Sequence, residues 1–205
     1  MDAIILVDLQ NDFLPGGALA VPAGNEVIPV ANRLLKHFEL VVATQDWHPV
    51  NHVSFAANHP GKSPGEQIEA NGLVQFLWPI HCVQETRGAR LAADLGLRRI
   101  RRVFPKGTDP RIDSYSGFYD NGHMKSTGLG EFLKFQGVGN CYIMGLATDY
   151  CVKFTALDAR SEDFETYLVL DGCRGVELAV GDVQRSIDEM AKSGVEIVYS
   201  HEIAV

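Results

Sequence analysis

Met144-Gly145-Leu146-Ala147-Thr148-Asp149-Tyr150-Cys151 joins a predicted strand to a predicted helix. The apolar run at 141–144 is typical of a buried strand, and residues 152–160 carry apolar side chains at helical spacing. Cys151 therefore falls in the first turn of a helix, where the helix dipole and unpaired backbone N–H groups favour a thiolate. Such a position lowers a cysteine pKa from about 8.5 into the range of about 3.5–7.5, which indicates a nucleophile. The alternative interpretation is that Cys151 is a small buried core residue.

Apolar segments typical of buried strands alternate with helical patterns along the chain. The predicted strands are 3–9, 40–46, 102–106, 141–146, 165–171 and 195–199. The predicted helices are 25–38, 88–95, 129–135, 152–160 and 179–193, the last with Val183, Ile187, Met190 and Ala191 inward and Gly194 as C-cap. This order predicts one α/β domain over residues 1–205, with a six-stranded parallel sheet in a three-layer, Rossmann-like α/β/α arrangement. Segment 47–100 is too long for a plain connection, so we expect a functional loop insertion there.

The bulk composition excludes several classes of protein. The net charge is −8 and the acidic residues are scattered, which argues against a nucleic-acid-binding protein. No apolar run approaches the roughly 20 residues needed to cross a bilayer, so we expect no membrane partner. Asp2 and Asp8 interrupt any signal-peptide pattern, and we therefore expect a cytoplasmic protein. The four cysteines form no CxxC pair and are interpreted as free thiols, whereas the oligomeric state stays open, with a homo-oligomer as one alternative.

Polar residues follow four of the predicted strands at the point where each strand ends. Asp8 ends the first strand, Asp46 the second and Lys106 the third, and Cys151 lies just beyond the fourth. Ligands of open parallel sheets bind beyond the carboxyl ends of the strands, so these side chains should meet at one edge. A strand-end acid on its own is as often a simple loop cap, but four chemically capable residues together favour an active site.

Asp8, Lys106 and Cys151 make chemical sense as one unit. A thiol that attacks a carbonyl must lose its proton, and a nearby carboxylate can take that proton and later pass it to a departing amine. A lysine beside them holds the carboxylate in place and adds positive potential. No G-x-S-x-G elbow occurs in the sequence, which disfavours a serine hydrolase.

A second candidate site lies in the long insertion. Asp46 and His48 are two residues apart, and three more histidines, His52, His59 and His81, follow in the same segment. A carboxylate with imidazoles and no thiolate suits a divalent metal such as zinc, iron or manganese. The alternative is that these are ordinary surface or core histidines, and His59 is the member we expect to take no part.

Several motifs resemble one known family, the nicotinamidases, also called pyrazinamidases, within the isochorismatase-like cysteine hydrolases. The resemblance spans nearly the whole chain in order. The matching segments are Asp8-Leu9-Gln10-Asn11-Asp12-Phe13, Thr44-Gln45-Asp46-Trp47-His48-Pro49, Trp78-Pro79-Ile80-His81-Cys82-Val83, Lys106-Gly107, Asp113-Ser114-Tyr115-Ser116, Gly145-Leu146-Ala147-Thr148-Asp149-Tyr150-Cys151 and Asp171-Gly172-Cys173-Arg174.

The resemblance implies a role for each of these motifs. It implies an isochorismatase-like fold with a catalytic triad of Asp8, Lys106 and Cys151. It also implies a cis peptide between Leu146 and Ala147 and an oxyanion hole formed by the N–H groups of Ala147 and Cys151. The implied substrate-binding residues are Phe13, Trp78, Tyr115 and Ala147. The implied metal ligands are Asp46, His48 and His81, with His52 as a further candidate and zinc as the expected cation, iron or manganese being alternatives.

The activity implied is hydrolysis of nicotinamide to nicotinate and ammonia through a cysteine thioester, in NAD salvage, with pyrazinamide as a second substrate. The alternatives within the superfamily are an amidase for carbamoyl compounds or another amide, and a metal-independent isochorismatase that cleaves a vinyl ether. The second of these would leave Asp46, His48 and His81 without a use. A third alternative is a non-catalytic binding module with an unreactive Cys151.

Overall fold

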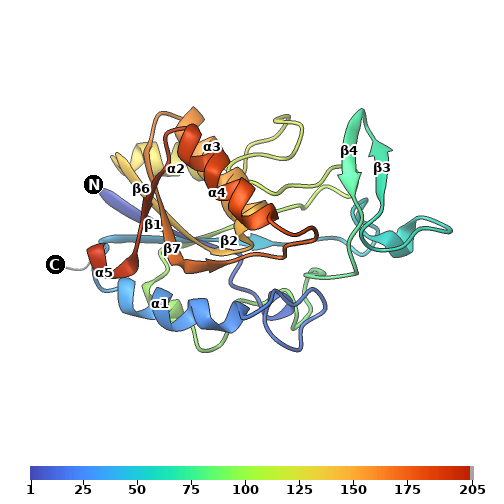
Figure 1. The fold of residues 1–205 in the computed structure, drawn as a ribbon, viewed down its shortest axis with the longest axis horizontal. Coiled ribbons are helices and arrows are strands. Elements are labelled where there is room, and N and C mark those ends of the chain that lie inside the picture. The colour runs from blue at the N-terminus through green and yellow to red at the C-terminus, as the bar shows by residue number, and fades with distance from the viewer. Residues whose placement is uncertain (204–205) are drawn as a thin grey trace.

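The computed structural model describes residues 1–203 and contains a six-stranded sheet between two layers of helices (Figure 1). The strands of this sheet are β1 (Asp2–Val7), β2 (Leu40–Asp46), β5 (Arg102–Lys106), β6 (Asn140–Leu146), β7 (Glu165–Arg174) and β8 (Glu196–Val198). The helices are α1 (Val27–Leu34), α2 (Leu129–Phe135), α3 (Lys153–Ser161), α4 (Asp182–Lys192) and α5 (Ser200–Ile203). All neighbouring strands are parallel, which confirms the predicted fold class.

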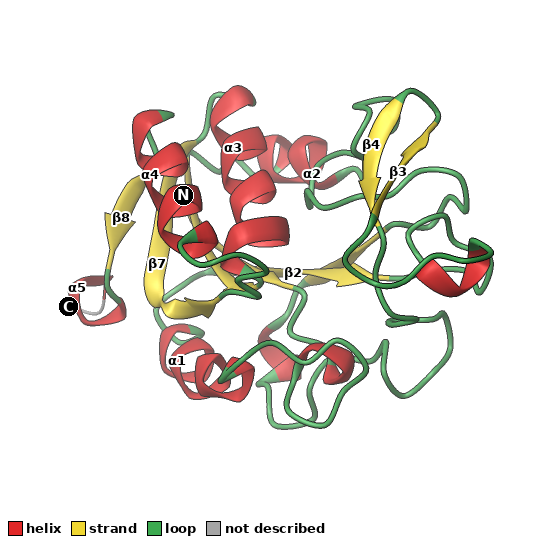
Figure 2. Cartoon of the chain, turned by 45° about the vertical axis from the view of Figure 1, so that its right-hand side comes forward, coloured by secondary structure: helices red, strands yellow, loops and turns green. Residues whose placement is uncertain are grey.

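The helices cover both faces of the sheet. Helix α1 lies on one face near α5, and α2, α3 and α4 lie on the other (Figures 1 and 2). Five consecutive residues of β1, Ala3 to Val7, are completely buried, as expected for a central strand covered on both faces. The buried apolar face of α1 includes Val27, Ala31 and Leu34, which recur at helical spacing.

The strand order places a topological switch point between β1 and β6. The order across the sheet is β5-β2-β1-β6-β7-β8, so the chain builds outward from β1 on one side and then crosses to build on the other. Strands β1 and β6 pair from Asp2↔Asn140 to Val7↔Gly145. The crevice beyond their carboxyl ends is where ligands bind in folds of this type.

The predicted helix at 88–95 is wrong. The backbone of this segment bonds to the loop after β1, with Ala92 N donating to Leu9 O and Asp12 N donating to Gly88 O. The Gln10 side chain also donates to Ala89 O at 2.8 Å. These tertiary hydrogen bonds use the groups that a helix would pair internally, and local periodicity does not reveal such competition.

The insertion also contains a hairpin that the periodicity did not predict. Strands β3 (Gln67–Ala70) and β4 (Leu73–Phe76) pair antiparallel and stand apart from the main sheet (Figure 2). Their two-residue connection is Asn71-Gly72, and both residues have positive φ, as a tight hairpin turn requires. Gln75 on β4 is buried and reaches toward the main body of the molecule.

Helix α4 differs in length and in its buried face from the helix predicted at residues 179–193. Helix α4 is shorter than the predicted 179–193, and Ala191 is exposed rather than inward. Ser186 is buried in its place because it lies one turn before Met190 on the same face. Gly194 follows the helix with φ of +87°, which agrees with the predicted C-cap role.

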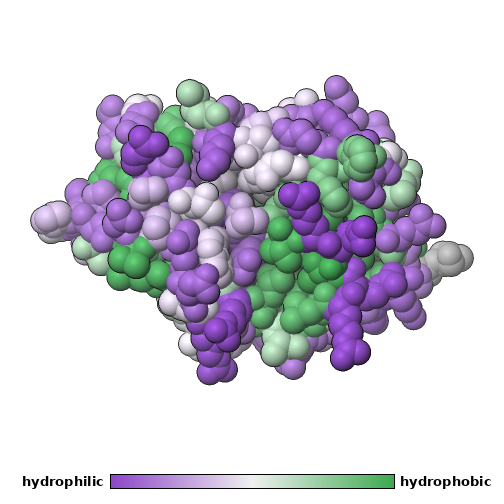
Figure 3. Space-filling model, turned by 180° about the vertical axis from the view of Figure 1, so that it is seen from behind, coloured by the Kyte–Doolittle hydropathy of each residue, from purple (hydrophilic) through white to green (hydrophobic). Residues whose placement is uncertain are grey.

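The surface combines charged and apolar side chains. Figure 3 shows the face behind that of Figure 1, where apolar side chains gather in one area bordered by hydrophilic ones. Large exposed apolar residues within residues 1–203 include Val74, Phe154 and Val180. None of the helices in this described part of the chain is long and apolar enough to cross a membrane.

Candidate active site

The four strand-end residues meet at the switch point, and Lys106 is at their centre. Its Nζ lies 2.9 Å from Asp8 Oδ2 and donates to Cys151 Sγ at 3.3 Å. It also donates to Asp46 Oδ1 and to the backbone oxygen of Ser114, the latter at 2.9 Å. The lysine therefore contacts the nucleophile candidate, the base candidate and the metal-ligand candidate together.

Register explains why these side chains converge. Asp46 and Lys106 are paired neighbours at the ends of β2 and β5. Asp8 follows β1, and Cys151 lies within the π-helical turn that comes after β6, Thr148–Val152. All four are almost completely buried, with Asp8 at 0% and Cys151 at 7% exposure. Water is thus largely excluded from the charges, which strengthens their mutual interactions.

The expectation of a lowered pKa for Cys151 is wrong. Burial raises the pKa of this thiol well above its usual range, and Lys106 opposes the rise while Asp8 and Asp46 add to it. The helix start that the sequence revealed is present, but the sequence did not reveal how completely the loops cover it. The resting cysteine is therefore a thiol, and its reaction requires a base to remove the proton.

Asp8 has the properties of such a base. Burial raises its pKa to about 6, although Lys106 lowers it. A carboxylate oxygen of Asp8 lies within 4.8 Å of Cys151 Sγ. A base with a pKa close to neutrality both accepts and returns a proton readily. The charge of Lys106 is secure because Asp46 and Asp8 outweigh burial and hold its pKa well above its usual value.

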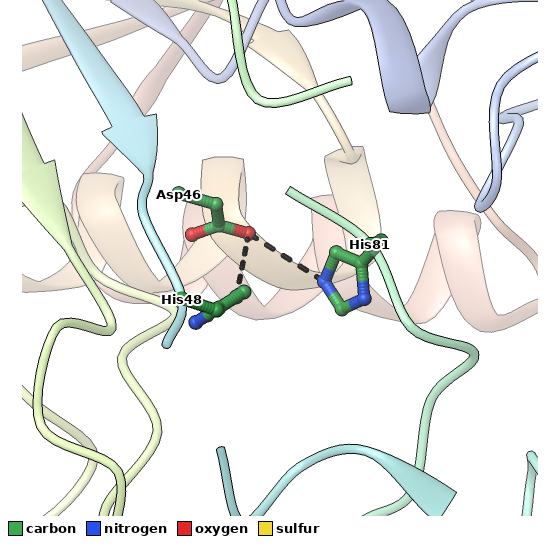
Figure 4. A group of neighbouring side chains, drawn as sticks. All are labelled: Asp46, His48 and His81. Atoms are coloured by element: carbon green, nitrogen blue, oxygen red, sulfur yellow. Dashed lines mark ion pairs between the residues drawn. The ribbon is translucent and has the colours of Figure 1, made fainter. Parts of the chain in front are cut away.

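A possible metal centre lies beside this cluster and shares Asp46 with it. Asp46 Oδ2 lies 3.5 Å from His48 Nε2 and 3.9 Å from His81 Nε2 (Figure 4). The other ring nitrogens are used by backbone, since His48 Nδ1–H donates to Gly107 O at 2.9 Å and His81 Nδ1–H to Pro79 O at 2.7 Å. These bonds direct both Nε2 lone pairs toward the carboxylate, an arrangement typical of metal-binding histidines.

The charges around this group also suit a cation. Burial works against ionised Asp46, yet Lys106 and His48 keep its pKa well below the usual range. Burial and the neighbouring His48 lower the pKa of His81 to about 4, so its imidazole is neutral at pH 7. Two imidazole nitrogens and one carboxylate match the ligand types preferred by zinc, iron(II) or manganese(II). The residues present therefore fit the implied metal.

His52 and His59 occupy different positions. His52 is fully buried and groups with His48 and Asp113 rather than with the Asp46, His48 and His81 set. Its Nδ1 is 2.7 Å from Ser54 Oγ, and burial lowers its pKa to about 4. His59 bonds to Val53 O at 2.7 Å and belongs to no candidate metal group within residues 1–203.

One pocket connects the thiol to the possible metal centre. Cys151 and Ala147 lie on its wall, as do Asp46, His48 and His81. The three predicted aromatic residues also line it, namely Phe13, Trp78 and Tyr115. Trp78 Nε1–H donates to the Tyr115 hydroxyl at 3.2 Å, which fixes the two rings relative to each other. The wall is mainly apolar and suits a flat ring.

Some pocket residues were not predicted from the sequence. Tyr150 lines the pocket and packs edge-on against Trp78, with ring centroids 4.9 Å apart. Its position next to Cys151 was an available signal. Asp113 also lines the pocket, where Gln75 of the hairpin donates to it at 3.0 Å. The remaining apolar members are Leu19, Val21 and Val176, and no local motif marks them.

The backbone at the end of β6 has the predicted form. The peptide between Leu146 and Ala147 is cis. The cysteines at 82, 141, 151 and 173 are all free, as expected.

Known proteins resemble this chain over nearly its whole length. The nicotinamidase of Escherichia coli (strain K12) is 47% identical over 199 residues, covering 95% of this chain and 93% of that protein. A solved nicotinamidase/pyrazinamidase from Acinetobacter baumanii has a TM-score of 0.96 at 44% identity, covering 98% of this chain and 97% of that one. A pyrazinamidase of Pyrococcus horikoshii, solved in complex with zinc, has a TM-score of 0.79 at 40% identity, covering 97% and 98%. Residues 2–202 match the isochorismatase domain, and the chain belongs to the isochorismatase family.

Proposed function

We propose that this protein is a nicotinamidase, which hydrolyses nicotinamide to nicotinate and ammonia and so serves NAD salvage. The observation that carries the proposal is one pocket lined both by Cys151 and by Asp46, His48 and His81. A carboxamide attached to a heteroaromatic ring needs both features, a nucleophile for the carbonyl carbon and a recognition group for the ring nitrogen. The 47% identity to the Escherichia coli nicotinamidase supports the same substrate.

Asp46, His48 and His81 would hold one divalent cation. When bound, this cation supplies a Lewis acid that a pyridine nitrogen can coordinate. Zinc is the cation we propose, because the donors are imidazole and carboxylate and a 40% identical pyrazinamidase was solved with zinc. His52 belongs to a different group of side chains, so we assign it no place among the three ligands.

The aromatic side chains orient the ring. Phe13, Trp78 and Tyr115 line the same pocket, and the hydrogen bond from Trp78 to Tyr115 keeps two of them in a fixed relation. Packing against them excludes water and holds the carboxamide near Cys151, which converts a bimolecular encounter into an oriented reaction. Pyrazinamide has the same carboxamide and a ring of the same size, so we propose it as a second substrate.

The reaction starts with removal of the thiol proton. Asp8 takes the proton from Cys151 Sγ as the sulfur attacks the carboxamide carbon. Lys106 contacts both groups and stabilises the negative charge as it moves between them. The N–H groups of Ala147 and Cys151 form the oxyanion hole in this proposal, and one such donor is typically worth about 10²–10³ in kcat.

The second half of the reaction uses Asp8 again. Asp8 returns its proton to the amide nitrogen as the C–N bond breaks, and ammonia leaves a thioester on Cys151. Water then attacks the thioester carbon while Asp8 takes a proton from it, and Asp8 returns that proton to the sulfur as the C–S bond breaks. The acid product loses its own proton to solvent and departs as nicotinate. Each step moves one proton through a single carboxylate that lies within 4.8 Å of the sulfur.

The proposal is tested by comparing substrates on the zinc-loaded protein. Ammonia release is measured with nicotinamide, with pyrazinamide and with an acyclic carbamoyl amide of similar size. We expect the two heteroaromatic amides to be hydrolysed with a kcat/KM at least about 100-fold above that of the acyclic amide, since the latter cannot use the ring contacts. Equal or faster hydrolysis of the carbamoyl amide would identify a different amidase of the superfamily.

A further inference from the structure

Thr44 holds the catalytic carboxylate by two hydrogen bonds from a neighbouring strand. Its hydroxyl donates to Asp8 Oδ1 at 2.6 Å and accepts from the Asp8 backbone N–H at 3.2 Å. Both residues are completely buried. Asp8 has a φ of +50°, so its backbone no longer has the geometry of a strand at the residue that Thr44 binds by hydrogen bonds. The plane of the carboxylate is therefore set by Thr44.

The second carboxylate oxygen is in a different situation. Asp8 Oδ2 is buried and forms an ion pair with Lys106, whose Nζ lies 2.9 Å away. No hydroxyl or backbone N–H among the described residues donates to this oxygen, so it keeps a lone pair that can accept a proton. Because Oδ1 already accepts the Thr44 proton, a proton taken by Asp8 goes to Oδ2.

Gly117 fixes the rotamer of Thr44. A Cβ added at Gly117 would lie 2.6 Å from Thr44 Cγ2, closer than two carbon atoms can approach. The methyl group of Thr44 therefore occupies the space that a side chain at position 117 would fill. With its methyl seated there, the single χ1 angle of Thr44 leaves Oγ1 directed at Asp8.

We propose that Thr44 is a positioning residue for the hydrolysis and that it makes Asp8 react through one oxygen, Oδ2. The absence of a side chain at Gly117 leaves room for the Thr44 methyl group and so fixes the rotamer of Thr44. This inference rests on the proposed function. Oδ2 takes the Cys151 proton as the S–C bond forms and gives it to the amide nitrogen as the C–N bond breaks. Thr44 contacts neither sulfur nor substrate, and its role is to aim the carboxylate. Its loss should slow the proton transfers and leave ring binding unchanged.

The first test replaces the hydroxyl of Thr44 and measures ammonia release from nicotinamide. Thr44→Val should lower kcat by about 10- to 100-fold, the usual effect of losing a hydrogen bond to a charged group, with KM changed by less than about threefold. Thr44→Ser should restore kcat to within about fivefold of wild type, because the hydroxyl returns. Thr166→Val is the matched control, since Thr166 is buried, donates to Phe164 O and lies at the start of β7.

Three results would overturn the inference. A Thr44→Val variant with the kcat of Thr166→Val would show that the hydroxyl is not needed, and a Thr44→Ser variant as slow as Thr44→Val would show that bulk matters instead. A wild-type protein that releases no ammonia from nicotinamide would overturn both this inference and the proposed function. If Thr44→Val does not fold, Thr44→Ala compared with Thr44→Ser decides the same question.

A second variant tests whether Gly117 acts on Asp8 through Thr44. Gly117→Ala should displace the Thr44 methyl and lower kcat in the same direction, whereas Gly139→Ala, which meets nothing within 4 Å, should not. In the Gly117→Ala/Thr44→Val double variant the losses should not multiply, because both act through one contact. Fully multiplicative losses would show that Gly117 acts elsewhere and would overturn its part of the inference.

Discussion

Lys106 links two halves of the site that sequence reasoning treated separately. It contacts Asp8 and Cys151 on one side and Asp46 Oδ1 on the other, while Asp46 Oδ2 faces the two histidine nitrogens. One carboxylate therefore belongs to both the triad and the possible metal centre. This arrangement places one buried cation between two buried carboxylates, which compensates the cost of burying each charge alone.

The raised pKa of Asp8 predicts the acid limb of the pH profile. Burial raises this pKa from 3.8 to about 6, so the carboxylate is protonated at a higher pH than an exposed aspartate. As the pH falls through about 6 the base is lost, and kcat/KM should fall by about tenfold per pH unit below that point. The profile is measured with nicotinamide on zinc-loaded protein. Full activity retained down to pH 4.5 would contradict the assignment of Asp8 as base.

For the individual site residues, the sequence was enough to predict which side chains come together, but not how deeply each of them is buried. Asp8, Asp46, Lys106 and Cys151 could be placed together because parallel strands end at a common edge. The direction of the thiol pKa could not be predicted, because it depends on burial by distant loops. The hydrogen bond from Thr44 to Asp8 could not be predicted either, because it depends on the register between β1 and β2.

Among the elements, the turn after β5 controls the metal centre. Gly107 has a φ of +61°, and its carbonyl accepts the His48 Nδ1–H bond at 2.9 Å. A Cβ there would lie 2.3 Å from His48 Cε1. The turn thus sets both the tautomer and the position of one proposed ligand.

Gly107→Ala should therefore weaken metal binding. Displacing an outer partner of a metal ligand typically costs about 10- to 100-fold in affinity. Zinc content is measured by elemental analysis after dialysis against a graded series of chelator concentrations. The control is Gly137→Ala, because Gly137 also has a positive φ, +75°, but a Cβ there meets nothing within 4 Å. Equal zinc retention in the two variants would contradict the role of this turn.

The end of β6 depends on a second glycine. Gly145 has a φ of +132°, and a Cβ there would lie 2.1 Å from the backbone oxygen of Val7. Gly145→Ala should lower the free energy of unfolding by about 3–5 kcal/mol, since the two central strands must separate. The control is the exposed Gly139, which directly precedes the same strand. Gly139→Ala should change the free energy of unfolding by no more than about 0.5 kcal/mol. Chemical denaturation measures both, and similar midpoints would refute the close approach.

Long periodic elements were predictable from sequence, and elements held by tertiary contacts were not. Strands β2 and β5 and helix α2 begin and end where predicted, because continuous apolar runs or helical spacing mark them. The loop at 88–95 and the hairpin of β3 and β4 have no such signal. Their conformations depend on partners distant in sequence, such as Asp113 for Gln75.

For the whole molecule, one sheet runs from β1 at residue 2 to β8 at residue 198, which supports the proposal of a single domain over the chain. The possible metal centre lies between the main sheet and the insertion, since Asp46 ends β2 and His81 follows β4. A cation bound there would tie the insertion to the sheet. Metal binding should then raise the free energy of unfolding of the entire domain.

Metal removal should lower the melting temperature. A ligand at 100 times its Kd stabilises the folded state by about 2.7 kcal/mol, which corresponds to several degrees for a chain of this size. Calorimetry with excess zinc and with excess chelator measures the difference. Asp46→Asn removes the carboxylate shared by the two histidines and should abolish the zinc-dependent shift. A shift of unchanged size in that variant would show that zinc binds elsewhere.

Cys151 is the proposed nucleophile in the hydrolysis of nicotinamide, and every step of the reaction depends on it. The most direct measurement is the initial rate of ammonia release from nicotinamide by zinc-loaded Cys151→Ala, with Cys141→Ala, a buried free cysteine in β6, as control. We predict that the Cys151 variant keeps its melting temperature within a few degrees and loses at least about 10⁴-fold in kcat, while the control stays active. A Cys151→Ala variant that releases ammonia within tenfold of the wild-type rate would contradict the account.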